Sequence, residues 1–459
     1  MAGRRPAGPG SGPVGVRAPR PGRYRRRPLP RPSRLPRRRG GVTGVKFVID
    51  TAVFADAVGW AARFLPARPP VPVLAGIRLR AGEGRLTVTT FDYEVCAHAE
   101  TGADVGQDGT VLVSGRLLAE IARRLTAGSC EVNCEGATVW LRAGRAAFSL
   151  LTMPVEDYPS PPPAPPVIGR IDAAALSQVI GQTVVAASHD ATVPALCSIR
   201  IDLRPDGPPV LSATDRYRVA LGVVPGWQPT ITEPDDTADH HDADGSSSGT
   251  ATATVAGPVF VYWSTMAEIA KTMTGDAHLT LGLTLNDDGQ PQLLSVQGAG
   301  RTLITRTLDG AALDYATLLD KPRPHRVRLD TTAFLTAVRN VAVVAERNTP
   351  VHLSFTTATD QDDGEAAGEM TLQAGHGDEA TGRDTLPAHI HSNTGSVPPG
   401  IAFNPDFLAA ALGALGPGTT TYVSFADNTA VAALLCSAPP DNPAELGYRH
   451  YLMRIRATS

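Results

Sequence analysis

The sequence predicts an α+β fold of three tandem domains, each with two helices against an antiparallel sheet. Three observations carry this prediction. A strand followed by Asp and an amphipathic helix occurs three times, a second strand–helix module also occurs three times, and two proline-rich joints separate the copies. The 459 residues are enough for two to four domains. Internal repetition indicates an architecture assembled from copies of one unit.

The first module is a short strand that ends in Asp50, Asp172 or Asp330. Apolar residues follow each Asp at the fourth and eighth positions, as Phe54 and Val58 do after Asp50. That spacing lies on one face of an α-helix, and Asp is a preferred N-cap. Each copy therefore predicts a capped helix that packs one face on a sheet.

The second module is a short strand, a polar break and a helix, and it covers residues 111–125, 259–273 and 401–415. The first two copies share the tetrapeptide Ala-Glu-Ile-Ala. Alternating segments such as 138–142 and 147–151 follow the first copy. Alternation of apolar and polar residues is typical of strands with one buried face, so each domain combines two helices with hairpin-connected strands.

The proline-rich joints are residues 159–166 and 321–325. They divide the chain into an Arg/Pro-rich tail and three domains with the bounds 1–44, 45–160, 167–322 and 326–459. Polar stretches interrupt the second domain at 229–256 and the third at 357–369 and 375–399. Because these stretches are rich in Asp, Gly, Ser and His, we expect them to be disordered surface loops.

Basic and acidic residues are unevenly distributed. Of the 42 Lys and Arg residues, 13 arginines lie in residues 1–41, which contain no acidic residue, so the remainder carries 29 basic against 45 acidic residues. A body that acidic is not a general nucleic-acid binder, and any DNA contact requires a local basic surface. The tail is either a basic arm for DNA phosphates or upstream sequence translated from a wrongly assigned start.

No pattern of catalytic or metal-binding residues is present. The five cysteines indicate reduced core thiols, and Cys130 and Cys134 lack a second pair for a zinc site. The residues His389 and His391, like His240 and His241, lie in polar stretches without placed carboxylates. Neither a phosphate-binding loop nor a nucleophile elbow occurs. We expect no cofactor, no metal and no membrane-spanning segment.

Several stretches resemble the bacterial β sliding clamp of DNA polymerase III. They are residues 67–77, 144–159, 213–220 with its Thr-Asp-x-x-Arg motif, and 401–404, and the match runs from 45 to 456. The resemblance implies a head-to-tail homodimer with six domains around a hole, helices inside and sheets outside. It implies a non-catalytic processivity subunit of a DNA polymerase holoenzyme, a nucleotidyltransferase complex of the cytoplasm. Duplex DNA, the polymerase α subunit, the clamp loader and other clamp-binding proteins would be its partners.

If the helices line the hole, their basic residues would attract phosphate without reading bases. The alternative is that they are solvated helix faces without a ligand. The DNA-binding set is Arg63, Arg68, Arg116, Arg123, Arg124, Lys271 and Arg339, of which Arg68 is included for its loop position in the family. By family position, the dimer interface would join Phe148 and Leu150 to Val343 and Val344.

The resemblance also implies a hydrophobic peptide groove between the second and third domains. Its residues would be Leu196, Thr214, Arg216, Tyr217, Arg218, Val219, Leu318, Asn404, Phe407, Leu452, Met453, Arg454, Ile455 and Arg456. Leu196, Val219, Leu318 and Met453 would form the floor, with Arg218 and Arg454 at the rim. Core packing is the alternative for the apolar members. Arg454 replaces a usual Pro, Thr317 a common Arg, and Leu313 a usual Pro.

Three other functions compete with an ordinary clamp. The first is a specialised second copy that tolerates a groove inhibitor or serves another polymerase, and the altered C-terminus favours it. The second is a peptide-binding scaffold of the same fold that does not encircle DNA. The third is a metal-dependent enzyme built on the His-containing stretches. Ring formation separates clamp from scaffold, and loss of an activity on chelation would reveal the enzyme.

Overall fold

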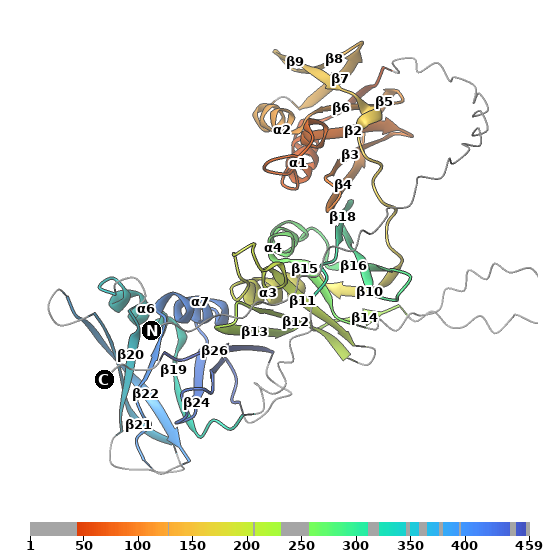
Figure 1. Ribbon diagram of the computed structural model, residues 1–459. Helices are drawn as coiled ribbons and strands as arrows, with labels where there is room; N and C mark the ends of the chain where they lie inside the picture. The colour runs from red at the N-terminus through yellow and green to blue at the C-terminus, as the bar shows by residue number, and fades with distance from the viewer. Residues whose placement is uncertain are drawn as a thin grey trace, which may run out of the picture. The chain divides into compact units, whose positions relative to one another are not determined.

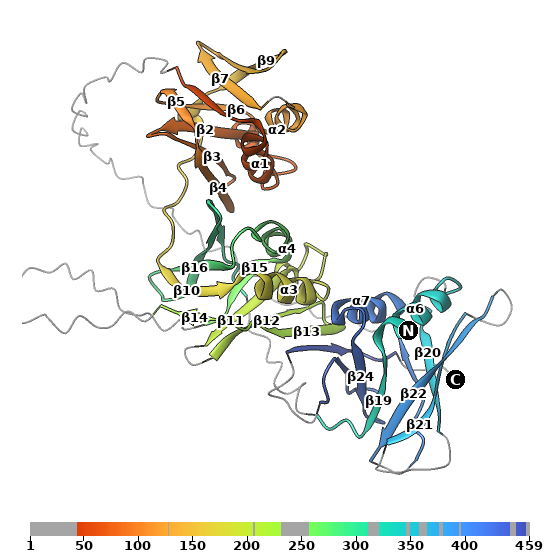
Figure 2. The ribbon, with the colours of Figure 1, turned by 180° about the vertical axis from the view of Figure 1, so that it is seen from behind.

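A computed structural model describes residues 44–126, 128–204, 207–230, 257–310, 321–345, 349–357, 365–375, 380–393, 396–440 and 447–455. Within these ranges, three helix pairs pack on antiparallel strands, one pair in each third of the chain (Figures 1 and 2). The predicted α+β fold with three tandem domains is confirmed.

The elements recur in nearly the same order. The first domain contains β1 (Lys46–Asp50), α1 (Thr51–Ala62), β2 (Gly76–Gly82), β3 (Arg85–Phe91), β4 (Val95–Gly102), β5 (Asp104–Gln107), β6 (Gly109–Ser114), α2 (Gly115–Arg124), β7 (Ser129–Glu135), β8 (Thr138–Ala143) and β9 (Ala146–Met153). The second contains β10 (Val167–Asp172), α3 (Ala173–Val184), β11 (Ser198–Arg204), β12 (Gly207–Thr214), β13 (Arg218–Val223), β14 (Gln228–Pro229), β15 (Val259–Tyr262), α4 (Trp263–Thr272), β16 (His278–Leu285), β17 (Pro291–Gly298) and β18 (Arg301–Arg306). The third contains β19 (His325–Asp330), α6 (Thr331–Ala342), β20 (Val351–Thr357), β21 (Glu365–Ala374), β22 (Gly382–Ser392), β23 (Ile401–Phe403), α7 (Pro405–Leu415), β24 (Thr420–Phe425), β25 (Ala433–Cys436) and β26 (Tyr448–Leu452).

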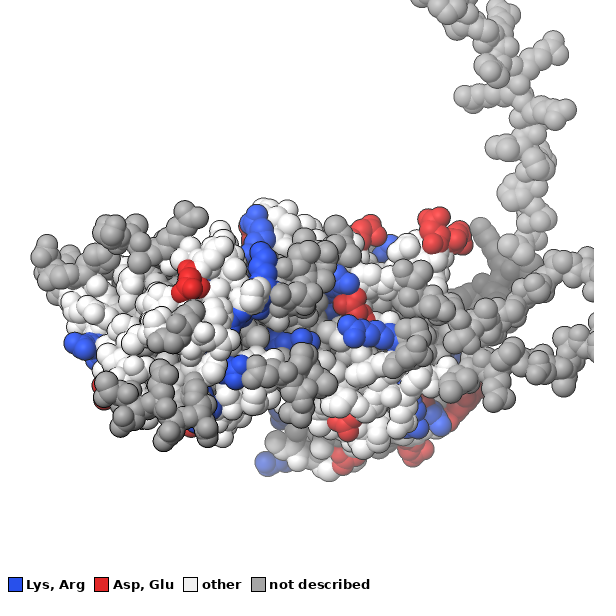
Figure 3. All heavy atoms as spheres, turned by 90° about the horizontal axis from the view of Figure 1, so that it is seen from below, with Lys and Arg blue, Asp and Glu red and all other residues white. Residues whose placement is uncertain are grey.

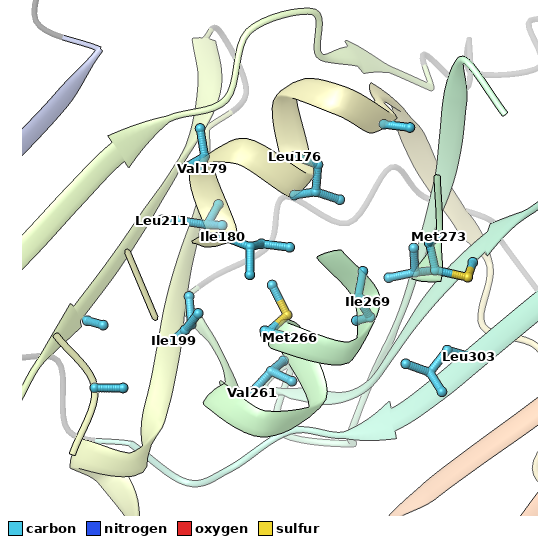
Figure 4. Packing of buried hydrophobic residues seen from close by; sticks show 14 of the residues in the cluster. Leu176, Val179, Ile180, Ile199, Leu211, Val261, Met266, Ile269, Met273 and Leu303 are labelled. Atoms are coloured by element: carbon cyan, nitrogen blue, oxygen red, sulfur yellow. The ribbon is translucent and has the colours of Figure 1, made fainter. Parts of the chain in front are cut away.

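The predicted aspartate caps begin the first helix of each domain. The Asp50 carboxylate accepts hydrogen bonds from the N–H groups of Ala52 and Val53, and Asp172 and Asp330 each accept from the residue three positions on. These N–H groups have no partner inside the helix, so each cap contributes about 1 kcal/mol. Each second helix then packs against the first across apolar side chains. In Figure 4, Leu176 and Ile180 of α3 lie near Met266 and Ile269 of α4.

Sheets continue from one domain into the next at two seams. The last strand of the second domain, β18, pairs with β4 of the first, and Leu303 lies opposite Ala97. The last strand of the third domain, β26, pairs with β13 of the second, and His450 lies opposite Ala220. Backbone hydrogen bonds therefore cross both seams, and each seam covers two sheet edges that would otherwise be exposed.

The expectation of loops at 357–369 and 375–399 is wrong in part. Strands β21 and β22 pair over their full length from Ala374↔Gly382 to Glu365↔His391. Met370, Leu372 and Ile390 are buried while polar residues alternate with them on the other face. Polar composition concealed this alternation, because half of each strand faces away from the core. Residues 231–256 lie outside the described residues.

A buried histidine lies at the seam between the second and third domains. His450 is fully buried, and its Nδ1 is 2.9 Å from the hydroxyl of Tyr448. Burial, with a smaller effect of the Arg218 charge, lowers the pKa of His450 to about 3. An unfolded histidine takes up a proton near pH 6.5. The stabilisation from keeping His450 neutral is therefore complete above that pH and is lost as pH falls towards 3.

We predict that His450→Phe makes folding less sensitive to acid. At pH 5 the parent should have lost about 2 kcal/mol through this group, because protons bind preferentially to its unfolded chain. Melting temperatures of parent and variant, measured at pH 7 and pH 5, test this. The parent should fall further than the variant, and equal falls would show that His450 titrates normally.

Candidate nucleic-acid and peptide interfaces

Helices α1, α2 and α4 enclose a cleft of about 720 Å³ at the seam between the first two domains. The small residues Ala55, Gly59, Ala62 and Ala119 line it, which explains why it is hollow. Arg63, Arg116, Arg123 and Lys271 also border it and are exposed. Four residues of the predicted DNA-binding set therefore gather around one concave surface.

Hydrogen bonds and an ion pair join the first two domains beneath this cleft. The indole N–H of Trp60 donates to Thr272 Oγ1 at 3.0 Å, and Trp60 is buried. Arg301 donates to the Thr272 carbonyl at 2.7 Å, pairs with Asp56 at 2.6 Å, and lies 5.4 Å from the centre of the Trp60 ring. Neither Trp60 nor Arg301 is among the residues that the sequence predicts to be functional. An apolar helix position and a strand-end arginine carry no local sign of a partner some 200 residues away.

The remaining predicted DNA residues lie outside the cleft lining. Arg124 follows Arg123 on α2, and Arg339 is exposed on α6. Arg68 is exposed in the loop after α1, and Arg116 donates to the carbonyls of Pro66 and Ala67 beside it. Helix α3 has no charged residue, and the only charge on α7 is Asp406. The basic character is therefore concentrated in the first domain and α4.

Charges elsewhere are dispersed. On the face in Figure 3, basic and acidic side chains lie singly or in small groups among uncharged residues. Much of the acidic excess seen in the sequence falls on ranges such as 231–256, outside the described residues.

The turn between β12 and β13 shapes the predicted peptide groove. The Asp215 carboxylate accepts hydrogen bonds from the N–H groups of Tyr217 and Arg218 and also binds the Arg218 guanidinium at 2.8 Å. Arg216 adopts a φ of 81°, an unusual conformation for a non-glycine residue. This turn leaves Tyr217 exposed beside Phe407, with ring centres 6.3 Å apart. The Tyr217 and Phe407 rings thus form an aromatic surface, and the hydrogen bonds of the turn fix the backbone beneath it.

The residues predicted to form the floor of the peptide groove lie behind this aromatic surface. Leu196 and Val219 are buried, and a hollow of about 260 Å³ is lined by Leu196, Thr214, Arg216 and Phe260 among others. Val219, Leu434 and Tyr451 belong to a separate apolar cluster, against which Met453 packs. Tyr451 was missed because its neighbours on β26 read only as a strand. Leu318 and Arg456 lie outside the described residues.

The C-terminal segment joins the two domains that border the groove. The Met453 N–H donates to the Tyr217 carbonyl at 2.9 Å, and the Ile455 N–H donates to the Ala402 carbonyl at 2.8 Å. Asn404 lies two residues beyond and caps α7 through the Phe407 N–H. The segment predicted to complete the groove is therefore fixed at both ends.

The expected rim positions of Arg218 and Arg454 are wrong. The Arg218 side chain is largely buried between Asp215 and Phe407, whose ring centre is 4.3 Å from its guanidinium. Arg454 is 7 % exposed and donates to the Asn428 carbonyl. Burial lowers the pKa of the Arg454 guanidinium, and the charge of Asp427 partly offsets this. Both cations are therefore structural parts of the groove walls.

Arg454 is one of three side chains that hold residues 426–432. Arg323 donates to the Ala432 carbonyl at 3.0 Å, and its guanidinium lies 5.1 Å from the Tyr451 ring centre. His325 Nε2 is 2.8 Å from the Asp427 carboxylate. These residues come from the joint before β19 and from the C-terminal segment. They bring residues 426–432 and the segment after β26 into one wall.

The predicted dimer residues lie on two different surfaces. Phe148 is half-buried and Leu150 is buried against the core of its own domain. Val343, just after α6, is 83 % exposed, and Val344 beside it is half-buried. Leu151, which the sequence analysis did not name, is 76 % exposed on β9. Exposed apolar side chains at both places are typical of an interface.

Among the described residues, those considered for other chemistry do not form a metal site, and His240 and His241 lie outside the described ranges. All five cysteines are buried and free, which confirms them as core thiols, and burial raises the pKa of Cys96 and Cys436 to about 12. His389 and His391 lie on β22, where buried Ile390 separates them. Within the described ranges, no group of three or more His, Cys, Asp and Glu residues is arranged to hold a metal ion. No described helix has the length and apolarity that crossing a membrane requires.

Comparison with known proteins decides the family. Residues 45–162 match the family model described as "DNA polymerase III beta subunit, N-terminal domain". The beta sliding clamp of Streptomyces coelicolor is 35 % identical over 412 residues, which cover 90 % of this chain and 99 % of that protein. The chain belongs to the beta sliding clamp family.

Other members of the beta sliding clamp family match as broadly. The beta sliding clamp homolog GriR of Streptomyces muensis is 30 % identical over 90 % of this chain and 99 % of its own length. The crystal structure of the Bacillus subtilis sliding clamp superimposes with a TM-score of 0.75 at 19 % identity, covering 91 % of this chain and all of that one. Sliding clamps are non-catalytic processivity factors, and this chain is a DNA sliding clamp.

We predict that Arg454→Pro weakens peptide binding. The change removes the donor to the Asn428 carbonyl, so residues 426–432 must be ordered at the expense of binding free energy. Affinity for the peptide Gln-Leu-Ala-Leu-Phe should fall roughly tenfold, about 1.4 kcal/mol. Calorimetric titration measures it, with Arg339→Met as a control that removes an exposed arginine elsewhere. Equal affinities for parent and Arg454→Pro would show that Arg454 does not shape the groove.

Proposed function

We propose that this chain closes as a head-to-tail homodimer around duplex DNA and tethers a replicative polymerase to its template. The observation that carries the proposal is a pair of unfilled sheet edges. The last strands β18 and β26 each pair with the fourth strand of the preceding domain. Strand β9 is the last strand of the first domain, and β22 is the fourth strand of the last domain. Joining β9 to the β22 of a second copy repeats the same seam and closes the ring.

Both strands have one free edge within the described residues. Strand β9 pairs with β8 from Ala146 to Leu151 and with β6 only at Thr152 and Met153. Strand β22 pairs with β21 throughout but with β19 only from His389 onwards. Residues 146–151 and 382–388 therefore leave backbone groups for another chain. Unpaired edges of this length are templates for strand addition.

The two existing seams determine the register. Three residues occupy equivalent positions in their domains: Ala97, Ala220 and Gly382. Each lies opposite the last inward-facing residue of the strand before it, which is Thr90, Ala213 and Ala374 respectively. Ala97 lies opposite Leu303, the third residue of β18, and Phe148 is the third residue of β9. Phe148 would therefore lie opposite Gly382. A side chain at Gly382 would meet Val344 and Val341, so Phe148 would pack on Val344.

We predict that cysteines at Ala147 and Arg383 join two chains. In this register the two positions are directly opposite and face outwards, with Cα atoms about 5.5 Å apart, within the range of a disulfide. Mild oxidation of the Ala147→Cys/Arg383→Cys variant should give a covalent dimer on a non-reducing gel. The control pairs Ala147→Cys with Thr385→Cys, a diagonal separation of about 7–8 Å. Preferential crosslinking of the control pair would contradict the register.

The peptide groove supplies another part of the proposal. We propose that the polymerase α subunit, the clamp loader and other clamp-binding proteins place a short peptide on Leu196, Val219 and Met453, with Leu318 and Arg456 completing the groove. Burial of one Leu or Phe anchor there would contribute about 1.5–3 kcal/mol. The domain bounds 45–160, 167–322 and 326–459, a cytoplasmic location and membership of a nucleotidyltransferase complex belong to the same proposal.

We predict that the loaded protein stays on circular DNA and leaves linear DNA. A closed ring is held by topology, so retention on a nicked plasmid should survive salt that dissociates contacts to phosphate. Gel filtration of plasmid loaded by a clamp loader, before and after one restriction cut, measures this. Salt-sensitive loss from the uncut circle would contradict encirclement and favour the peptide-binding scaffold.

A second candidate is a specialised copy with an altered groove. The buried Arg454, in a position where the family usually has Pro, favours it. Its guanidinium ties the C-terminal segment to Asn428, which a proline could not do. The Arg454→Pro titration separates the candidates, because an unchanged affinity leaves the specialised copy without its supporting feature.

A further inference from the structure

Two glutamates occupy the same position in the repeated second helix. Glu120 of α2 and Glu268 of α4 each lie in the tetrapeptide Ala-Glu-Ile-Ala. Glu120 binds both Arg123 and Arg124, while Glu268 binds Arg63 and Lys271, each at 3.3 Å. The two carboxylates thus engage four of the seven predicted DNA-binding cations. Each one serves two cations at once.

The geometry of these pairs differs from that of isolated surface pairs. Arg63 comes from the first domain and Lys271 from the second, so Glu268 joins cations across the seam at the cleft. The Glu268 side chain is 26 % exposed, less than either partner. Hydrogen bonding by Arg124, and then the charge of Arg123, hold the pKa of Glu120 below its ordinary range. Both carboxylates are therefore placed to compete with phosphate for their cations.

Competition between these carboxylates and DNA phosphates for the same cations sets how strongly the basic residues bind DNA. Each lysine or arginine that contacts a phosphate releases a counterion and makes binding more salt-dependent. A cation already paired with a carboxylate must break that pair first. The paired state is restored as soon as the phosphate moves away, which keeps each contact brief. A ring that must move along DNA needs such exchangeable contacts.

We propose that Glu120 and Glu268 hold their four paired cations back from the phosphodiester backbone and so lower the friction between the ring and duplex DNA. This inference rests on the proposed function. The duplex would lie against the cleft of the first two domains, since α3 carries no charge and α7 carries only Asp406. The carboxylates act through the cations and need not touch DNA themselves.

Asp406 provides a matched control on the same kind of helix. It is exposed in the first turn of α7, and no basic partner is recorded for it among the described residues. Asp406→Asn removes one negative charge without releasing a cation, whereas Glu120→Gln and Glu268→Gln each release two. Net charge alone would therefore make all three variants alike. If release of paired cations matters, the two glutamate variants should differ from Asp406→Asn.

The test follows the full-length ring on stretched duplex DNA by single-molecule tracking. Glu120→Gln/Glu268→Gln should lower the diffusion coefficient several-fold at low salt, and the slowing should disappear as salt rises. In solution, the slope of log affinity against log salt for a duplex of 30 base pairs should steepen by about two to four, one per released cation. Asp406→Asn should leave both nearly unchanged.

Two outcomes would overturn the proposal. An unchanged diffusion coefficient and salt slope in the double variant would show that the glutamates do not restrain the cations. An effect of Asp406→Asn half as large as that of the double variant would show that only net charge matters, because it removes one negative charge and the double variant removes two. Parent and variants are also compared for retention on circular DNA and for melting temperature. Loss of retention by the parent would refute encirclement itself, which is a different failure from normal retention with unaltered friction.

Discussion

Pairing of backbone groups at sheet edges is the constraint on which this structure depends. A strand at an edge exposes N–H and C=O groups that favour any partner strand. The chain pairs four such edges internally, where β18 meets β4 and β26 meets β13. Free edges on β9 and β22 belong to opposite ends of the domain series. A second copy in head-to-tail orientation would pair both of them, while β5, β14, β15 and β23 stay at the ends of their sheets.

The seams share strand pairing but differ in side chains. Between the first two domains, the buried Trp60–Thr272 hydrogen bond and the Arg301–Asp56 ion pair reinforce the sheet. Between the second and third, neutral His450 is buried in the core while Arg218 and Tyr217 shape the outer surface. One repeated backbone arrangement therefore supports a charged cleft at one junction and an apolar groove at the other. The functional difference between the two junctions therefore comes from their side chains, since the backbone pairing is the same at both.

Local features were the ones that the sequence predicted best. Asp50, Asp172 and Asp330 were identified as helix caps, because a cap and its apolar spacing lie within a few residues. The polar composition of residues 357–369 and 375–399 predicts loops, whereas β21 and β22 occupy part of these ranges, since their pairing partner rather than their composition makes them strands. The wall position of Arg454 was missed for the same reason. Its acceptor, the Asn428 carbonyl, is distant in sequence and has no side-chain signature.

The mass of the protein in solution tests the central claim most directly. Closure requires two chains, and an interface of paired strands with Phe148 against Val344 should persist at micromolar concentration. Sedimentation equilibrium of the purified full-length chain should give twice the 48.0 kDa of one chain. A Phe148→Asp variant should shift towards the monomer, because an unpaired carboxylate would be buried at the interface. A parent protein that sediments as a monomer across this range would contradict the ring.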